Sequence, residues 1–452
     1  MRCGVTSLTC FYGQHNWKLI PKSNANKHKI NPFELKIDTF NLIFSMMNSN
    51  QKHVCRHLIG LLLLNIFLLP AVSEEVPFFD RLKQARFPYS YVVFEKLDVA
   101  DGKELEYLEL EKKWLAIHNI MAKRGKILSW GLAKARTNSL GYEYVSWKTF
   151  RSLKDLEMVY NWAELGNLVG NEKLNDLLKK TGETRTIIGT QVLKLRDCSM
   201  IPLNDMSRLA QLKPSDLFIR VKFMEPKKGK MENFLKIVDE GLSPLYQKFT
   251  EANKKFFSWE FQELLFHKGK GSRESFRAFE IKRNDTSGGI SKKERSKIEN
   301  GIGPWPGTIS PRESIKKLAK IDTVYFDVVY LTSGNAEATV RNNLQGIWTH
   351  TNPDGSFRTK VMTHYTEQLS FYHSDGKLIY ARPTMPFRIE VSDKLTRFTV
   401  FQPDGSTWHA SMQLHDGKWY EQDRNLSYTN DHGKTPPPAP NAYYIYSRSS
   451  NP

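Results

Sequence analysis

The sequence predicts an α+β protein, in which two consecutive β-α-β-β-α-β units are followed by an antiparallel β-barrel. Residues 102–130 and 229–259 share a Gly-Lys opening, an aromatic-Leu pair and a closing Ser-Trp at nearly constant offsets. Such an internal repeat indicates two similar structural units. Residues 343–449 contain four Asp-Gly pairs, which are typical of hairpin turns.

The first unit is predicted from a helix flanked by strands. Over residues 103–124, the apolar side chains recur at intervals of three and four and so share one helical face: Tyr107, Leu110, Trp114, Ile117 and Met121. A strand is expected before this helix, at residues 91–97. Further strands are expected at 128–132, 142–150 and 186–195, and helices at 153–160 and 172–180.

The second unit repeats this order. Strands are expected at 217–223, 257–261, 276–281 and 324–331, with helices at 235–252 and 311–320. Pro244 lacks a backbone N–H and should kink or interrupt the longer helix. The basic cluster 292–297 lies in a polar insertion, 284–310, and is interpreted as a solvated loop and not as a nucleic-acid arm. Residues 333–342 are expected to be a polar linker.

The C-terminal region has the pattern of an up-and-down antiparallel barrel. Eight or nine short strands fit into residues 343–449, and no helix is needed. Along one of them, Trp408, Ala410, Met412 and Leu414 alternate with polar residues, which indicates a strand with one buried face.

The N-terminus has the layout of a secretory signal peptide over residues 46–73. Basic residues precede an apolar run, 58–69, which ends in small residues before Glu74. A membrane anchor is the alternative, but the run is shorter than the ~20 residues that span a bilayer. We therefore expect export to the periplasm or the cell exterior, in a bacterial host, with no stable membrane insertion after cleavage. Residues 1–45 are interpreted as an extension upstream of the true start at Met46 or Met47.

The net charge bears on the expected partners, and the cysteine count bears on disulfide bonds. The formal net charge is +18; residues 1–73 hold 8 Lys or Arg and 2 Asp or Glu, so about +12 remains after cleavage. This charge is dispersed along the chain, and no nucleic-acid partner is expected. Cys198 alone would survive cleavage, so no internal disulfide is expected.

Two resemblances to known families follow from these motifs. The Gly-Lys opening, the segment Trp114-Leu115-Ala116-Ile117-His118 and the strand Ser129-Trp130-Gly131-Leu132 resemble the ferredoxin-like, dimeric α/β-barrel superfamily. That superfamily includes antibiotic-biosynthesis-type and haem-degrading monooxygenases. The resemblance implies that units 85–200 and 213–333 pair into one barrel within the chain. Leu344-Gln345-Gly346-Ile347-Trp348 and Tyr443-Tyr444-Ile445-Tyr446 make residues 343–449 resemble a small lipocalin-like domain.

His118 is the candidate catalytic residue, because the family's pocket lies between this helix and the sheet. The resemblance implies a general base or a haem contact there, whereas a partly buried structural histidine is the alternative reading. Tyr246 occupies the matching position in the second unit. The candidate ligand-binding residues are aromatic, and an ordinary aromatic core is their alternative role: Trp114, Trp130, Tyr142, Tyr144, Trp147, Tyr246 and Trp259.

The chain lacks the common catalytic signatures: no P-loop, Gly-x-Ser-x-Gly elbow, His-Glu-x-x-His or dinucleotide fingerprint is present. The histidines of the C-terminal region lack the spacing of a metal site, and no metal is expected. The leading hypothesis is an exported binding protein that holds a small apolar or aromatic ligand and has no cofactor. The alternatives are a cofactor-independent or haem-linked monooxygenase-like enzyme that uses the first unit, and a structural or interaction module without a ligand.

Overall fold

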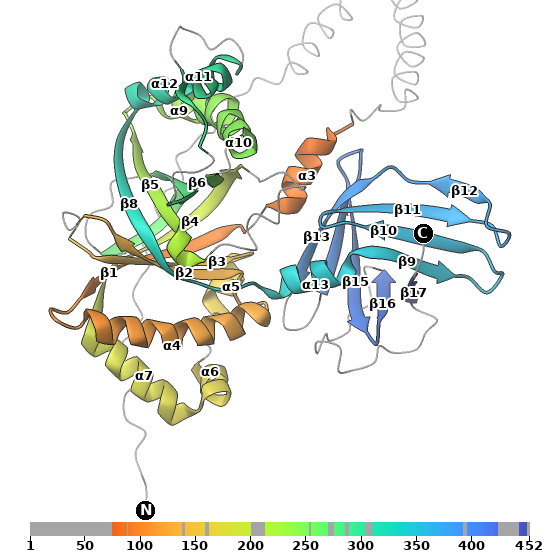
Figure 1. The fold of residues 1–452 in the computed structure, drawn as a ribbon, viewed down its shortest axis with the longest axis horizontal. Helices are drawn as coiled ribbons and strands as arrows, with labels where there is room; N and C mark the ends of the chain where they lie inside the picture. Colours follow the sequence, from red (N-terminus) through yellow and green to blue (C-terminus); the bar gives the residue numbers. More distant parts are fainter. Residues whose placement is uncertain are drawn as a thin grey trace, which may run out of the picture. The chain divides into compact units, whose positions relative to one another are not determined.

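The computed structural model describes residues 75–449, except 88, 138–140, 159–161, 200–212, 253–254, 270–274, 285–288, 303–309, 392–395 and 424–442. In this part of the chain, one sheet forms a closed eight-stranded barrel flanked by helices, and a second sheet has nine strands (Figure 1). The expected extension 1–45 and signal peptide 46–73 lie outside the described residues. Among the described helices, none has both the length and the apolar character needed to cross a membrane.

The first half of the closed barrel follows the predicted order of elements. Gly102 and Gly125 adopt φ values of 72° and bracket the long helix, as expected of turn and helix-exit glycines. The sequence analysis did not predict α6 (Trp162–Val169) within this half or the short helix α3 (Phe78–Arg86) before it. The elements are β1 (Tyr91–Val99), α4 (Glu104–Lys123), β2 (Ser129–Ala135), β3 (Tyr144–Phe150), α5 (Leu153–Met158), α6 (Trp162–Val169), α7 (Asn171–Thr184) and β4 (Arg185–Cys198).

The second half has the same order of strands and helices. A π-helical turn, Val238–Leu242, directly precedes Ser243 and Pro244. Proline has no N–H to continue an α-helical ladder, so the predicted interruption is confirmed as a π turn. The elements are a 3₁₀ turn (Pro214–Asp216), β5 (Leu217–Pro226), α9 (Met231–Ile237), α10 (Ser243–Ala252), β6 (Phe256–Gly269), β7 (Phe276–Arg283), α11 (Lys292–Asn300), α12 (Pro311–Leu318) and β8 (Ala319–Leu331).

The eight strands close in the order β1-β3-β2-β8-β5-β7-β6-β4. The two halves meet at two antiparallel seams, where β2 pairs with β8 and β4 pairs with β6. Side chains alternate between the two faces of the sheet. One apolar core therefore lies in the barrel interior, and two further cores lie between the sheet and the surrounding helices. Figure 1 shows α4 and α7 on the first half and α9 to α12 on the second.

Two expectations about polar segments were wrong. The basic cluster predicted as a loop forms α11, because Ser291 and Glu294 form a capping box at its N-terminus. The segment predicted as a linker contains α13 (Ala336–Leu344), which is capped by the Asn335 side chain accepting from the Ala338 N–H. In both helices a local cap outweighs a polar composition.

The second sheet comprises the nine strands expected at the upper limit of the prediction. Its order is β10-β9-β17-β16-β15-β14-β13-β11-β12, and an additional β10–β11 pairing closes eight of the strands into a circuit. The strand β12 pairs only with β11 among the described strands. The bounds are β9 (Gly346–Thr351), β10 (Phe357–Met362), β11 (Thr366–Tyr372), β12 (Leu378–Ala381), β13 (Met385–Val391), β14 (Thr396–Phe401), β15 (Thr407–His415), β16 (Lys418–Asp423) and β17 (Tyr443–Arg448).

The four Asp-Gly pairs lie in the turns predicted from them. Gly355, Gly376, Gly405 and Gly417 all have positive φ values, from 71° to 85°. In three of these turns the preceding aspartate side chain accepts a backbone N–H two residues later. The glycine supplies the left-handed conformation and the aspartate fixes the turn, as the sequence analysis assumed.

Candidate functional site

The predicted site residues are all buried, but they lie in three separate places. Trp114, His118, Trp130 and Tyr144 occupy the layer between α4 and the outer face of the first half. Tyr142 and Trp147 point into the barrel interior. Tyr246 and Trp259 lie between α10 and the outer face of the second half. The structure therefore does not assemble these eight residues into one pocket.

His118 lies in an aromatic layer below α4. Its ring stacks on Trp130, with centroids 4.7 Å apart and planes 10° apart, and lies 5.9 Å from the Trp114 ring. The side chain of Trp114 is anchored, because its Nε1 donates to Thr181 Oγ1 on α7 at 2.9 Å. These contacts fix the orientation of the imidazole.

The imidazole of His118 is neutral at physiological pH. It is 3 % exposed, and burial lowers its pKa well below the ordinary value, with a further decrease from the nearby cation Lys148; the Trp114 carbonyl opposes this decrease only in part. Apart from a weak interaction with the Trp114 backbone, neither ring nitrogen makes a hydrogen bond with a described residue. A buried polar group without a partner typically costs about 1–3 kcal/mol, so this position requires an explanation.

Tyr246 makes the corresponding stack in the second half. Its ring lies 4.9 Å from that of Trp259, with planes 1° apart. In contrast to His118, its hydroxyl group is satisfied, because Lys222 Nζ lies at 2.9 Å and Glu280 Oε1 at 3.0 Å. The two halves thus share an aromatic stack and differ at the polar group that it carries.

The other predicted aromatic residues have clear packing partners. Tyr144 contacts the Tyr107 ring at 5.0 Å and donates to the Glu104 carboxylate. Inside the barrel, the Trp147 indole covers Gly131 so closely that a Cβ there would lie 2.2 Å from a ring atom. These contacts are those of core residues.

A row of polar side chains inside the α/β barrel was not predicted. Tyr89 donates to the Glu260 carboxylate, and Gln262 Nε2 donates to the same carboxylate at 3.1 Å. Next to Gln262 in the register, Arg277 donates to Gln191 and lies over the Phe94 ring. Burial raises the pKa of Glu260 to about 7, and the two hydrogen bonds limit the rise.

The interior of the C-terminal barrel contains a buried ion cluster, also not predicted. Lys360 on β10 is 2 % exposed, and its Nζ lies 2.6 Å from Glu421 Oε2 and 3.5 Å from Glu367 Oε2. Although burial disfavours the ammonium, the two carboxylates and Tyr446 hold the pKa of Lys360 above its ordinary value. The alternation of Arg358, Lys360 and Met362 on one strand face was the sequence signal for this inward-pointing lysine.

Aromatic rings surround the Lys360 ammonium. Its Nζ lies 4.5 to 5.5 Å from the ring centroids of Trp419, Phe398, Tyr446 and Trp408. Trp419 Nε1 and the Tyr446 hydroxyl are fully buried beside this cluster, and neither has a hydrogen-bond partner in the described part of the chain. This interior therefore offers two unused hydrogen-bond donors next to an ammonium group.

Further cationic and aromatic groups continue from this cluster along the same inward-facing positions. Arg358 lies 3.5 Å from the Tyr444 ring centroid, and the His350 ring lies 5.6 Å from the same ring. Tyr444 is 42 % exposed. The buried Nε of Arg358 is another donor without a partner among the described residues. The interior is thus connected to the surface by aromatic and donor groups.

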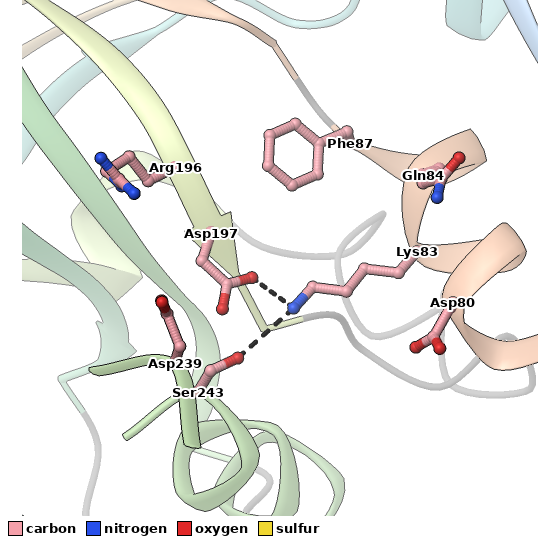
Figure 2. A pocket seen from close by; sticks show the side chains of 8 residues that line it. All are labelled: Asp80, Lys83, Gln84, Phe87, Arg196, Asp197, Asp239 and Ser243. Atoms are coloured by element: carbon pink, nitrogen blue, oxygen red, sulfur yellow. Dashed lines mark hydrogen bonds and ion pairs between the residues drawn. The ribbon is translucent and has the colours of Figure 1, made fainter. Parts of the chain in front are cut away.

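A separate surface pocket of about 370 Å³ is lined by α3, β4 and the π turn (Figure 2). Lys83 extends across it toward Asp197 and donates to Ser243 Oγ at 3.3 Å. Arg196, at the rim, pairs with Glu263 at 3.1 Å. Because its lining is polar and both cations are already paired, this pocket does not match the apolar or aromatic ligand expected from the sequence.

Comparisons with known proteins give structural matches only. No family model and no curated protein matches it. Solved structures that match part of it include an anthrone oxidase-like protein (14% identity, 55% of this chain and 95% of that chain, TM-score 0.32). A heme-binding protein from Thermus thermophilus (8%, 54% and 92%, 0.30) and a mutant chlorite dismutase from Candidatus Nitrospira defluvii (12%, 56% and 95%, 0.31) also match. At these scores the likeness assigns no activity to the chain.

Proposed function

We propose that this chain is a binding protein whose C-terminal barrel holds a small aromatic ligand that carries a hydrogen-bond acceptor. The observation that carries the proposal is the pair of buried donors, Trp419 Nε1 and the Tyr446 hydroxyl, beside Lys360. A ligand acceptor would satisfy groups that have no partner among the described residues, and each such group costs roughly 1–3 kcal/mol when it stays unsatisfied.

The chemistry of the ligand follows from the groups available to it. Beside Lys360, Trp419 Nε1 and the Tyr446 hydroxyl are donors without a partner among the described residues, whereas the one acceptor in that state, Glu367 Oε2, already faces the Lys360 ammonium at 3.5 Å. A carbonyl, phenolate, sulfonate or carboxylate would therefore fit better than an amine. The surrounding rings of Trp408, Phe398 and Tyr444 favour a flat apolar body.

We also propose a fold family for each of the two barrels. We assign the α/β half to two tandem ferredoxin-like units, supported by the matching stacks of His118 on Trp130 and Tyr246 on Trp259. We assign the C-terminal barrel to a lipocalin-like domain, supported by its eight-stranded circuit and by Trp348 near its start. Barrels of this size are wide enough for one small ligand.

We further propose that the protein is exported. Cleavage after Ser73 would release a mature chain beginning at Glu74 in the periplasm or outside the cell. N-terminal sequencing of the protein from its own host tests this, and a mature chain that retains residues 46–73 contradicts it.

A dye titration tests the ligand site. The probe is 8-anilinonaphthalene-1-sulfonate, an aromatic anion whose fluorescence rises on binding. We expect saturable binding to the full chain, weakened about tenfold by Tyr446→Phe and similarly by Trp419→Phe, since loss of one hydrogen bond is about 1.4 kcal/mol. Tyr330→Phe, in the α/β half, is the matched control. Equal affinity in all four proteins, with unchanged circular dichroism, would refute the site.

A second candidate is the monooxygenase-like enzyme, and His118 is the observation that favours it. A neutral imidazole whose ring nitrogens make no strong hydrogen bond to a described residue has the form required of a general base or a metal ligand. The residues around it do not fit a haem macrocycle, because His118 is buried in a layer where Ile117, Met121 and Trp130 pack into one core. We therefore propose no haem-dependent reaction at His118. A Soret band in the protein purified from its host, lost in His118→Phe, would reverse this preference.

A further inference from the structure

The outer face of the second half carries three cations around one carboxylate. Glu280 on β7 is fully buried, and Lys222 and Lys282 each place Nζ 2.9 Å from its oxygens. Arg220 on β5 pairs with the same carboxylate. Register explains this convergence, because Arg220 lies directly opposite Glu280 and all of these side chains point toward the helical layer.

The cluster has an excess of positive charge. Three cations against one carboxylate leave a formal charge of +2, and in the described residues no other carboxylate pairs with any of the three. Each cation is 20% exposed, so the cluster reaches solvent. The Arg220 Nε is buried and has no hydrogen-bond partner among the described residues.

The pKa shifts within the cluster agree with this excess of positive charge. Burial lowers the pKa of Lys282 to about 8; Glu280 opposes the decrease, and the neighbouring cations Arg220 and Lys222 add to it. Although burial opposes ionisation of Glu280, the three cations hold its pKa far below the ordinary range. The carboxylate is thus fully ionised and still does not balance the cations.

The first half shows that the fold does not require this excess. In its helix–sheet layer, Lys148 pairs with Glu95 at 3.3 Å and Arg185 pairs with Glu111 at 3.0 Å. Two cations meet two carboxylates there, and the formal charge is zero. The charge of +2 is therefore specific to the second half.

We propose that Arg220, Lys222 and Lys282 form a binding site for a phosphate group. Phosphate carries about −1.5 to −2 charges at neutral pH, which matches the excess, and its oxygens accept from guanidinium and ammonium groups together. Glu280 holds the three cations in place from below. The rings of Tyr246 and Phe256 lie 5.6 and 5.2 Å from Lys222 and Lys282 and form the apolar wall of the site.

Calorimetry with inorganic phosphate tests the site on the full chain. We expect Lys282→Gln to raise the Kd about tenfold, as for loss of one charge-assisted contact, and Lys320→Gln, on the neighbouring strand β8, to leave it unchanged. A phosphomonoester such as phenyl phosphate forms the second arm. Tighter binding of the ester identifies a phosphorylated small molecule, and equal binding identifies free phosphate. Absence of binding by both, or equal Kd values in the two variants, overturns the proposal.

A second readout does not depend on a variant. An amine with a pKa near 8 reacts faster with acetic anhydride than ordinary lysines do. We expect phosphate to protect Lys282 selectively from acetylation, measured by peptide mass spectrometry, while Lys320 stays unprotected. Equal acetylation of Lys282 with and without phosphate would contradict the site even where the Lys282→Gln protein fails to fold.

Discussion

Glu260 should make the stability of this protein fall as the pH rises. Its pKa is raised from 4.5 to about 7 by burial inside the α/β barrel, so the folded chain binds a proton that the unfolded chain releases. Stability is therefore highest below pH 4.5 with respect to this group and is lost as the pH rises to about 7. The difference corresponds to about 3 kcal/mol in the free energy of unfolding.

The substitution Glu260→Gln isolates this contribution. A glutamine oxygen can still accept from Tyr89 and Gln262, which both donate to the carboxylate in the structure. We expect the variant to be more stable than the wild type at pH 8, by up to about 3 kcal/mol, and to lose this advantage near pH 4.5.

Urea unfolding at pH 4.5, 6 and 8, followed by circular dichroism, measures this difference. The other titrating groups are common to both proteins and cancel in the comparison. Glu263→Gln, three strand positions further along and partly exposed, is the control and should follow the wild type. Parallel stability profiles for wild type and Glu260→Gln would refute the reasoning.

His118, Lys360 and two glycines provide further tests of the packing. Because the pKa of His118 is lowered, the unfolded chain takes up a proton below pH 6.5 that the folded chain does not, and stability falls with the pH; His118→Phe should flatten this decrease in thermal melts between pH 7.5 and 5. Lys360→Met leaves Glu421 buried without its cation and should cost about 3–5 kcal/mol in urea unfolding at pH 7; a cost below 1 kcal/mol would contradict the buried pair. Gly131→Ala puts a methyl group 2.2 Å from the facing indole and should cost about 1–3 kcal/mol, whereas Gly182→Ala, which meets nothing within 4 Å on α7, should stabilise by up to about 1 kcal/mol.

Elements with a regular apolar pattern were predictable, and capped polar elements were missed. The apolar residues Tyr107, Trp114 and Met121 recur with the period of an α-helix and not with that of a strand, and this pattern predicted α4. Helix α11 has no such stripe, and its one signal was Ser291 followed three residues later by Glu294. The polar composition of the segment favoured a loop, but the capping box stabilises a helix there.

The pairing of buried charges could not be predicted from the sequence, for a different reason. Alternation indicates which face of a strand Lys360 occupies, but its partner Glu421 lies 61 residues away in the chain. No local pattern pairs two such positions, because only the closed sheet brings them together. The sequence also could not distinguish aromatic ligand contacts from aromatic core residues. Trp147 and Tyr144 are both buried, and such side chains pack in a core as readily as in a pocket.

The seam between β2 and β8 constrains the order in which this protein can fold. The Trp130 N–H donates to Thr332 Oγ1, which lies 202 residues later. Until residue 331 has left the ribosome, β2 therefore has an unpaired edge. Unpaired edges readily recruit strands from other chains, and contacts over such long separations form slowly. A second copy could supply its own β8 to this edge, so a strand-swapped dimer is the natural misassembly of this barrel.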